Sequence, residues 1–256
     1  MPESIFDSKK RRVTINFGQN PASVVKHYLN YTDYRKEVTV MREIGRYGFS
    51  PQILSVSKNE LKEEYIEGKQ LRLAPIDTGQ LKELAAHLKL LHSHAVSPKL
   101  EKVLEKRKPY YDPLMIFKLI EKENALQAAE FPYYDLLRDL SLNFKPRRPL
   151  SLIHSDLNAT NIIISDRNGG VFLIDWIESR LDYPLVDLAN LVFQGNLDRR
   201  SKEIIAGAYG FMDNEMTDLN MLILLNAFFE HTSPEGKPRY AANIALKTGL
   251  EEGWMK

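Results

Sequence analysis

The chain has 256 residues, of which 35 are basic and 34 acidic, giving a formal net charge of +1 at pH 7. This length suffices for one large domain or two lobes with a substantial core. The balanced charge gives no sign of a nucleic-acid-binding surface. Because the sequence contains no cysteine, it excludes disulfides, thiol nucleophiles and zinc–thiolate sites.

The termini and apolar runs give no sign of a membrane protein. The first ten residues lack the apolar core of a signal peptide. The longest strongly apolar stretch, 219–229, is interrupted by Asn220 and Asn226 and is too short to span a bilayer. We therefore expect a cytoplasmic protein that has neither a membrane nor a nucleic acid as its partner.

The N-terminal quarter is predicted to form strands with one helix. Two β-rich runs, 13–17 and 23–29, are separated by a turn that contains Gly18, so they form a hairpin whose tip could cover phosphates. Apolar residues in 34–44 recur at the spacing of one helical face. A second hairpin is expected over 52–66.

The pattern becomes helical after Pro75. Asp77 is placed to cap a helix whose apolar residues recur every three or four positions. The nearby histidines, His87, His92 and His94, lack the spacing of a metal site, and we interpret them as packing or solvent-exposed residues.

Two further regions are predicted to be helical. Residues 99–149 are charge-rich and contain two tyrosine pairs; we expect two helices flanked by prolines, whose aromatic side chains either pack the region or surround a cationic ligand. Residues 199–256 are expected to form helices around 219–229 and 240–250.

The segment from Leu150 to Asp175 carries the clearest chemical pattern. An apolar run ends at a polar loop that contains His154, Asp156 and Asn161, and a short hairpin then ends at Asp175. Phosphoryl transfer requires a carboxylate near the acceptor hydroxyl and hard oxygen ligands for magnesium. We predict that Asp156 orients and deprotonates the acceptor, and that Asn161 and Asp175 hold the metal. An ordinary hairpin with polar turns is the alternative.

These residues resemble a known family. The pattern His154-x-Asp156-x-x-x-x-Asn161, then Ile174-Asp175-Trp176, then Asp187-Leu-Ala, is similar to that of the aminoglycoside phosphotransferase and choline kinase-like family. The resemblance implies a bilobal protein-kinase-like α+β fold, with a small β-rich N-terminal lobe (1–66) and a larger helical C-terminal lobe (67–256). It also implies that His154 and Asp187 support the catalytic loop.

The same resemblance implies a nucleotide site. Lys26 would reach the α- and β-phosphates of ATP, held by Glu37, which we prefer to Glu43 as its partner. Residues 63–66 would form the hinge that binds the adenine edge. The nucleotide-binding residues implied or predicted are Gly18, Lys26, Glu37, Glu64, Tyr65, Ile66 and Ile174.

The resemblance therefore implies an ATP- and Mg-dependent enzyme that phosphorylates a hydroxyl of a small molecule. Amino alcohols, aminoglycosides, thiamine and sugars remain open as acceptors. Glu178 and Asp182 are candidates to meet a cationic acceptor at the rim of the cleft. A nucleotide-binding pseudokinase without turnover and a protein kinase are the alternative functions. Against the protein kinase, no Ala-Pro-Glu segment follows Asp175.

Overall fold

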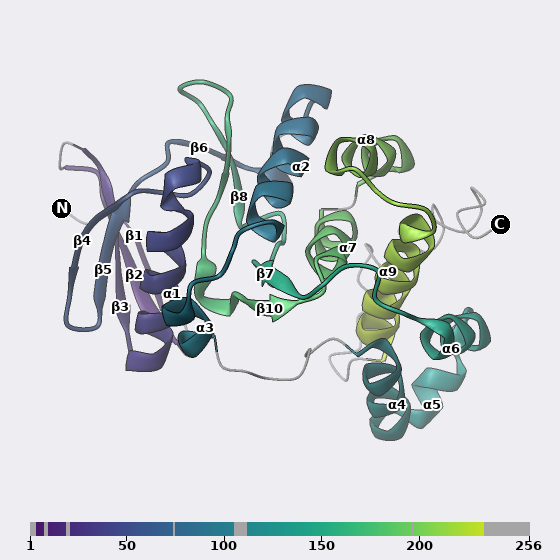
Figure 1. The fold of residues 1–256 in the computed structure, drawn as a ribbon. Coiled ribbons are helices and arrows are strands. Elements are labelled where there is room, and N and C mark those ends of the chain that lie inside the picture. The colour runs from purple at the N-terminus through teal and green to yellow at the C-terminus, as the bar shows by residue number, and fades with distance from the viewer. Residues whose placement is uncertain are drawn as a thin grey trace.

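The computed structural model describes residues 4–7, 10–18, 21–73, 75–104, 112–195 and 197–232. The N-terminal part of the chain is built on an antiparallel sheet, and most of the C-terminal part is helical (Figure 1). The chain thus has the predicted α+β, kinase-like class of fold. Among the described residues, no helix is long and apolar enough to cross a membrane.

The N-terminal sheet has five strands in the order β1-β2-β3-β5-β4. Helix α1 (Tyr31–Ile44) begins after Asn30, whose side chain accepts a hydrogen bond from the Thr32 amide. The strands are β1 (Ser4–Asp7), β2 (Arg11–Asn16), β3 (Ser23–Tyr28), β4 (Ile53–Ser57) and β5 (Glu60–Glu64). Both predicted hairpins and the predicted helix are therefore confirmed.

The register of this sheet determines which side chains share a face. Lys26 on β3 lies opposite Val13 on β2 and Leu61 on β5. Because side chains alternate along a strand, Arg11 and Ile15 lie on the same face as Val13. One face of the sheet thus presents two cations and several β-branched side chains.

A second, three-stranded sheet follows and has the order β6-β8-β9. Its strands are β6 (Gly68–Gln70), β8 (Ile162–Ser165) and β9 (Val171–Leu173). A Cβ atom on Gly68 would lie 2.2 Å from the Ile164 carbonyl oxygen, so only glycine allows β6 to approach β8 this closely. The lobe boundary after residue 66 stays a prediction.

Helices make up most of the C-terminal part. Helix α2 (Thr78–His92) has the predicted cap, since Asp77 and Gln80 form a reciprocal capping box. The remaining elements are α3 (Pro98–Val103), α4 (Pro113–Glu123), α5 (Ala125–Ala129), α6 (Tyr134–Asn143), α7 (Leu185–Gln194), α8 (Arg199–Tyr209), α9 (Glu215–His231) and the two-stranded pair β7 (Ser151–Ile153) and β10 (Arg180–Asp182).

The prediction of two helices over 99–149 is wrong. The described part of this region contains α3, α4, α5 and α6, because Asn124 ends one helix and Pro132 lies between the next two. Its described aromatic residues pack internally: the ring centroids of Phe131 and Phe228 lie 5.1 Å apart, and those of Phe117 and Tyr134 lie 5.2 Å apart. Tyr110, Tyr111 and the predicted helix over 240–250 lie outside the described residues.

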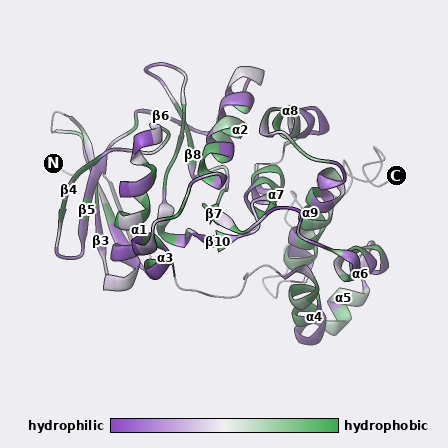
Figure 2. Cartoon of the chain, viewed as in Figure 1, coloured by the Kyte–Doolittle hydropathy of each residue, from purple (hydrophilic) through white to green (hydrophobic). Residues whose placement is uncertain are grey.

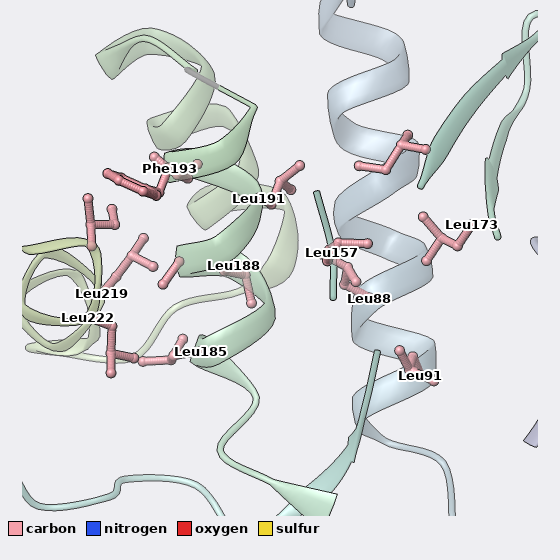
Figure 3. Close-up of a cluster of buried hydrophobic side chains, with 14 of the residues drawn as sticks. Leu88, Leu91, Leu157, Leu173, Leu185, Leu188, Leu191, Phe193, Leu219 and Leu222 are labelled. Carbon is pink, nitrogen blue, oxygen red and sulfur yellow. The ribbon is translucent and has the colours of Figure 1, made fainter. Parts of the chain in front are cut away.

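The main core of the C-terminal part lies between α2, α7 and α9 (Figure 3). Leu88 and Leu91 of α2 are fully buried, as are Leu157 in the loop between β7 and β8 and Leu188 of α7. Figure 2 shows hydrophobic residues along much of α9, which the surrounding helices cover. This packing fixes the position of the loop between β7 and β8.

Candidate active site

The loop between β7 and β8 holds Asp156 in a defined orientation. Asn158 Nδ2 donates a hydrogen bond to Asp156 Oδ1 at 3.1 Å, and Asn161 Nδ2 donates one to Asp156 Oδ2 at 2.9 Å. Asn161 Nδ2 also donates to the Asp156 carbonyl oxygen at 2.8 Å. Burial raises the pKa of Asp156, although the two amide donors act in the opposite direction.

Asp187 of α7 holds this loop in place through hydrogen bonds to its backbone. Its carboxylate accepts hydrogen bonds from the backbone amides of His154 and Ser155, both at 2.7 Å, and from His92 Nε2 at 3.1 Å. Ser155 has a φ of 73°, a value that non-glycine residues seldom adopt. Burial tends to raise the pKa of Asp187, but the hydrogen bond and charge of His92 outweigh it, so the pKa lies below its ordinary value.

His154 and Asn190 make further contacts that hold the loop. The His154 ring is fully buried, and its Nε2 donates to the carbonyl oxygen of Ile174 at 2.9 Å. Asn190 Nδ2 donates to the Ser155 carbonyl oxygen at 3.1 Å. The His154 side chain thus lies inside the protein and links the loop between β7 and β8 to Ile174, the residue that precedes Asp175.

Asp175 follows β9 with a φ of 70° and lies beside a guanidinium group. Its Oδ2 accepts a hydrogen bond from Arg11 Nη2. Its Oδ1 is buried and has no hydrogen-bond partner in the part of the chain that the structure describes. Burial tends to raise the pKa of Asp175, but the charges of Arg11 and Lys26 outweigh it and lower the pKa.

Lys26 lies in a buried cluster of charges. Its Nζ donates to Glu37 Oε1 at 2.6 Å and forms an ion pair with Glu63 Oε1 at 2.8 Å. The other oxygen of Glu37 accepts hydrogen bonds from Tyr28 at 2.7 Å and from Arg11 Nη1 at 3.0 Å. The structure thus pairs Lys26 with Glu37, as expected.

Glu43 has other partners. It bonds to His94 Nε2 at 3.1 Å and to the Ser97 hydroxyl. His92 and His94 are therefore both structural residues. Within the described ranges, no group of three or more His, Cys, Asp or Glu side chains is arranged to hold a metal ion.

The charged cluster forms one end of a cavity of about 560 Å³ between the two sheets. This volume falls within the range typical of small-molecule sites. The apolar lining residues are Val13, Ile15, Val24, Pro51, Ile66, Ile163 and Ile174, and the charged ones include Arg11, Lys26, Glu63, Glu64 and Asp175. The cavity therefore has an apolar section, bordered by the predicted hinge, and a charged end.

Two candidate residues do not lie where the sequence suggested: Gly18, expected over the phosphates, and Asp182, expected at the rim of the cleft. Gly18 lies in the turn after β2, where the Tyr65 amide donates to Ala22 and the Phe17 and Tyr65 rings are in contact. That turn is at the hinge end of the sheet, opposite Arg11, so Gly18 does not cover the charged end. Asp182 is fully buried and bonds to Arg180 and the Tyr183 amide, so it is not a residue of the cleft rim.

A family model described as "phosphotransferase enzyme family" matches residues 24–219, which include all of the charged cluster except Arg11. The chain belongs to this phosphotransferase family. The resemblance seen in the sequence is therefore confirmed. No curated protein sequence matches the chain.

Solved structures share the fold of this phosphotransferase family member at low sequence identity. A spectinomycin phosphotransferase in complex with ADP and spectinomycin has a TM-score of 0.66 and 16% identity, over 96% of this chain and 92% of the other. An ethanolamine kinase from Plasmodium vivax has a TM-score of 0.61 and 17% identity, over 95% of this chain and 80% of the other. A choline kinase from Streptococcus pneumoniae has a TM-score of 0.59 and 17% identity, over 96% of this chain and 93% of the other.

Sequence reasoning missed several residues of this candidate site, among them Arg11, Glu63 as a partner of Lys26, and Asn190. A signal for Glu63 was present, because Leu61 and Glu63 alternate along a strand next to β3 and thus share a face with Lys26. Asn190 lies three residues after Asp187, one helical turn along α7. Arg11 gave no comparable signal, since its contact with Asp175 spans 164 positions in the sequence.

Proposed function

We propose that this protein transfers the γ-phosphate of Mg-ATP to a hydroxyl group of a small molecule. The observation that carries the proposal is the charged end of the cavity, where Lys26, its partner Glu37 and Asp175 meet. Asp156 lies on the adjoining loop and is connected to the Asp175 region through Asn161, whose carbonyl oxygen accepts from the Ile174 amide at 3.0 Å. Positioning and charge neutralisation are the main requirements of this chemistry.

The nucleotide would lie along the cavity. Its adenine fits the apolar section between Val24 and Ile174, beside the backbone of Glu64, Tyr65 and Ile66. The Tyr65 amide already donates to Ala22, so recognition of the base edge falls to the neighbouring backbone groups. The phosphates would then reach Lys26.

The residues present fit a magnesium ion. Among the described residues Asp175 Oδ1 is a buried carboxylate oxygen without a partner, and such an atom is costly unless a ligand satisfies it. Because the side-chain nitrogen of Asn161, Nδ2, donates to Asp156, the side-chain oxygen Oδ1 would face the metal. Magnesium commonly takes only one or two protein ligands and completes its shell with phosphate and water. When bound, it would neutralise charge on the transferred phosphate.

Asp156 would orient the acceptor hydroxyl and accept its proton. The two amide donors fix the direction of the carboxylate, which is what a positioned base requires. The names of the similar structures, which include a choline kinase and a spectinomycin phosphotransferase, support a small-molecule alcohol as the acceptor class. Amino alcohols, aminoglycosides, thiamine and sugars form the panel to test.

The test is to follow ADP release from Mg-ATP with each acceptor, using wild-type protein and Asp156→Ala. Acceptor-dependent release by the wild type alone supports the proposal. Binding of ADP with and without magnesium is measured in parallel for the wild type and Asp175→Ala, which should lose the magnesium-dependent part of the affinity. Nucleotide binding without turnover on any acceptor would favour a non-catalytic nucleotide-binding module.

A further inference from the structure

Arg11 joins the two functional carboxylates of the nucleotide cavity. Its Nη1 donates to Glu37 Oε2 at 3.0 Å, and its Nη2 donates to Asp175 Oδ2. The side chain retains only 10% of its exposure, and it is among the residues that line the cavity. A single guanidinium therefore connects the partner of Lys26 to the predicted metal ligand.

This contact conflicts with metal binding at Asp175. The Arg11 guanidinium carries a fixed positive charge, and it occupies one oxygen of a carboxylate whose other oxygen is buried. A divalent cation bound to that carboxylate would lie a few ångströms from the guanidinium in a poorly solvated site, where repulsion between like charges is strong. Either the metal binds weakly or Arg11 moves away from Asp175.

The geometry also places Arg11 where it could bind the phosphates of a nucleotide. Arg11, Val13 and Ile15 share one face of β2, so a nucleotide whose base packs on the two apolar side chains would direct its phosphates toward Arg11. A guanidinium offers a planar set of donors that matches phosphate oxygens. A change of side-chain rotamer would exchange the carboxylate of Asp175 for the phosphates as the acceptor.

We propose that Arg11 is a phosphate-binding residue that neutralises Asp175 in the nucleotide-free protein and transfers to the phosphates when the nucleotide and metal bind together. This inference rests on the proposed function. Its consequence is cooperativity: the phosphates remove the cation that opposes the metal, and the metal frees the cation that binds the phosphates. By linkage, each ligand raises the affinity of the other by the same factor.

The experiment measures a binding cycle by calorimetry, with ADP alone, Mg²⁺ alone, ADP in saturating Mg²⁺ and Mg²⁺ in saturating ADP. It compares wild type, Arg11→Met and Arg12→Met. Arg12 is the matched control, because it is the next residue on β2, exposed and on the opposite face, and its replacement removes the same charge. Arg11→Lys serves as a second variant that keeps the charge but lacks the planar set of guanidinium donors.

In Arg11→Met we expect metal-free ADP to bind about tenfold more weakly and Mg²⁺ alone about tenfold more tightly, each corresponding to roughly 1.4 kcal/mol. The coupling between the two ligands should fall in Arg11→Met and remain at the wild-type value in Arg12→Met. Arg11→Lys should bind metal-free ADP with intermediate affinity.

Two outcomes would overturn the inference. If the wild type binds Mg-ADP and both Arg11 variants show the wild-type cycle, Arg11 is structural and the proposed function stands. If the wild type itself binds no ADP with or without Mg²⁺, the proposed function fails and the inference fails with it. A circular dichroism spectrum of each variant verifies folding before titration, and Arg11→Lys decides the matter if Arg11→Met does not fold.

Discussion

The carboxylate of Asp187 receives the backbone amides of two successive residues, His154 and Ser155, at 2.7 Å each. This pair of bonds bends the chain immediately before Asp156 and compensates for the unusual φ of Ser155. The direction of the Asp156 side chain thus depends on a buried acid 31 positions further along the chain.

Asp187→Asn tests this dependence. The amide has one acceptor oxygen in place of two, so a buried N–H group loses its partner, at a cost of about 1–3 kcal/mol in the free energy of unfolding. We also expect kcat to fall more than nucleotide affinity, because the cavity lies on the other side of the loop. Urea unfolding and steady-state kinetics measure the two effects. The isosteric Asp187→Asn should lose less unfolding free energy than Asp187→Ala, because it keeps one acceptor oxygen. Equal losses in the two variants would contradict this expectation.

Asp187 also predicts a pH dependence of stability. Its folded pKa lies below the ordinary 3.8, so its ionised form stabilises the protein above that value, and this contribution is lost as the pH falls through the lower folded pKa. The difference in unfolding free energy between wild type and Asp187→Asn should therefore shrink on acidification. Urea titrations between about pH 2 and pH 6 measure it; a difference that grows toward low pH would contradict the assignment.

Asp156→Asn should separate chemistry from binding. If Asp156 is the positioned base, kcat should fall by about 10²–10⁴ while ADP affinity stays unchanged. The control is Asp166→Asn, the same chemical change at an exposed turn after β8. Loss of nucleotide binding in Asp156→Asn would show that the residue acts on the nucleotide instead.

Lys26→Met leaves Glu37 and Glu63 buried without their shared cation. The free energy of unfolding should decrease by about 3–5 kcal/mol, because a buried charge without a partner is more costly than the pair. Adding Glu63→Gln should recover part of this loss, because it removes the carboxylate charge that Lys26 had balanced, whereas Glu37 keeps its hydrogen bond from Arg11. Lys58→Met, in the exposed turn between β4 and β5, is the control. Denaturant unfolding of the four proteins provides the comparison.

The packing of α2 predicts that two of its leucines contribute very differently to the free energy of unfolding. Leu88 is fully buried, whereas Leu90 is 42% exposed. Leu88→Ala should lower the free energy of unfolding by about 2–5 kcal/mol through lost contacts and a cavity. Leu90→Ala should change it by no more than about 0.5 kcal/mol. Similar losses for both variants would mean that the helix is packed on a different face.

Local patterns were sufficient for much of the fold, and they singled out Asp156, Asn161 and Asp175 as candidates whose roles stay predictions. The two N-terminal hairpins and the capped helix α2 depend on alternation and capping within short segments, which can be read directly from neighbouring residues. The number of helices in residues 99–149 was harder to predict, because Asn124 interrupts a continuous helical pattern. The position of Arg11 follows from the packing of distant segments, which no local pattern encodes.

The contact at Gly68 has a consequence for the length of molecule that the site can accept. Strand β6 leaves the hinge and is hydrogen-bonded to β8, which begins directly after Asn161, and no side chain separates the two backbones at Gly68. The spacing between the predicted hinge and the loop that carries Asn161 is therefore set by direct backbone contact between β6 and β8. Because this spacing is fixed, the number of phosphates on a nucleotide bound along the cavity would decide whether its terminal phosphate reaches Asp156.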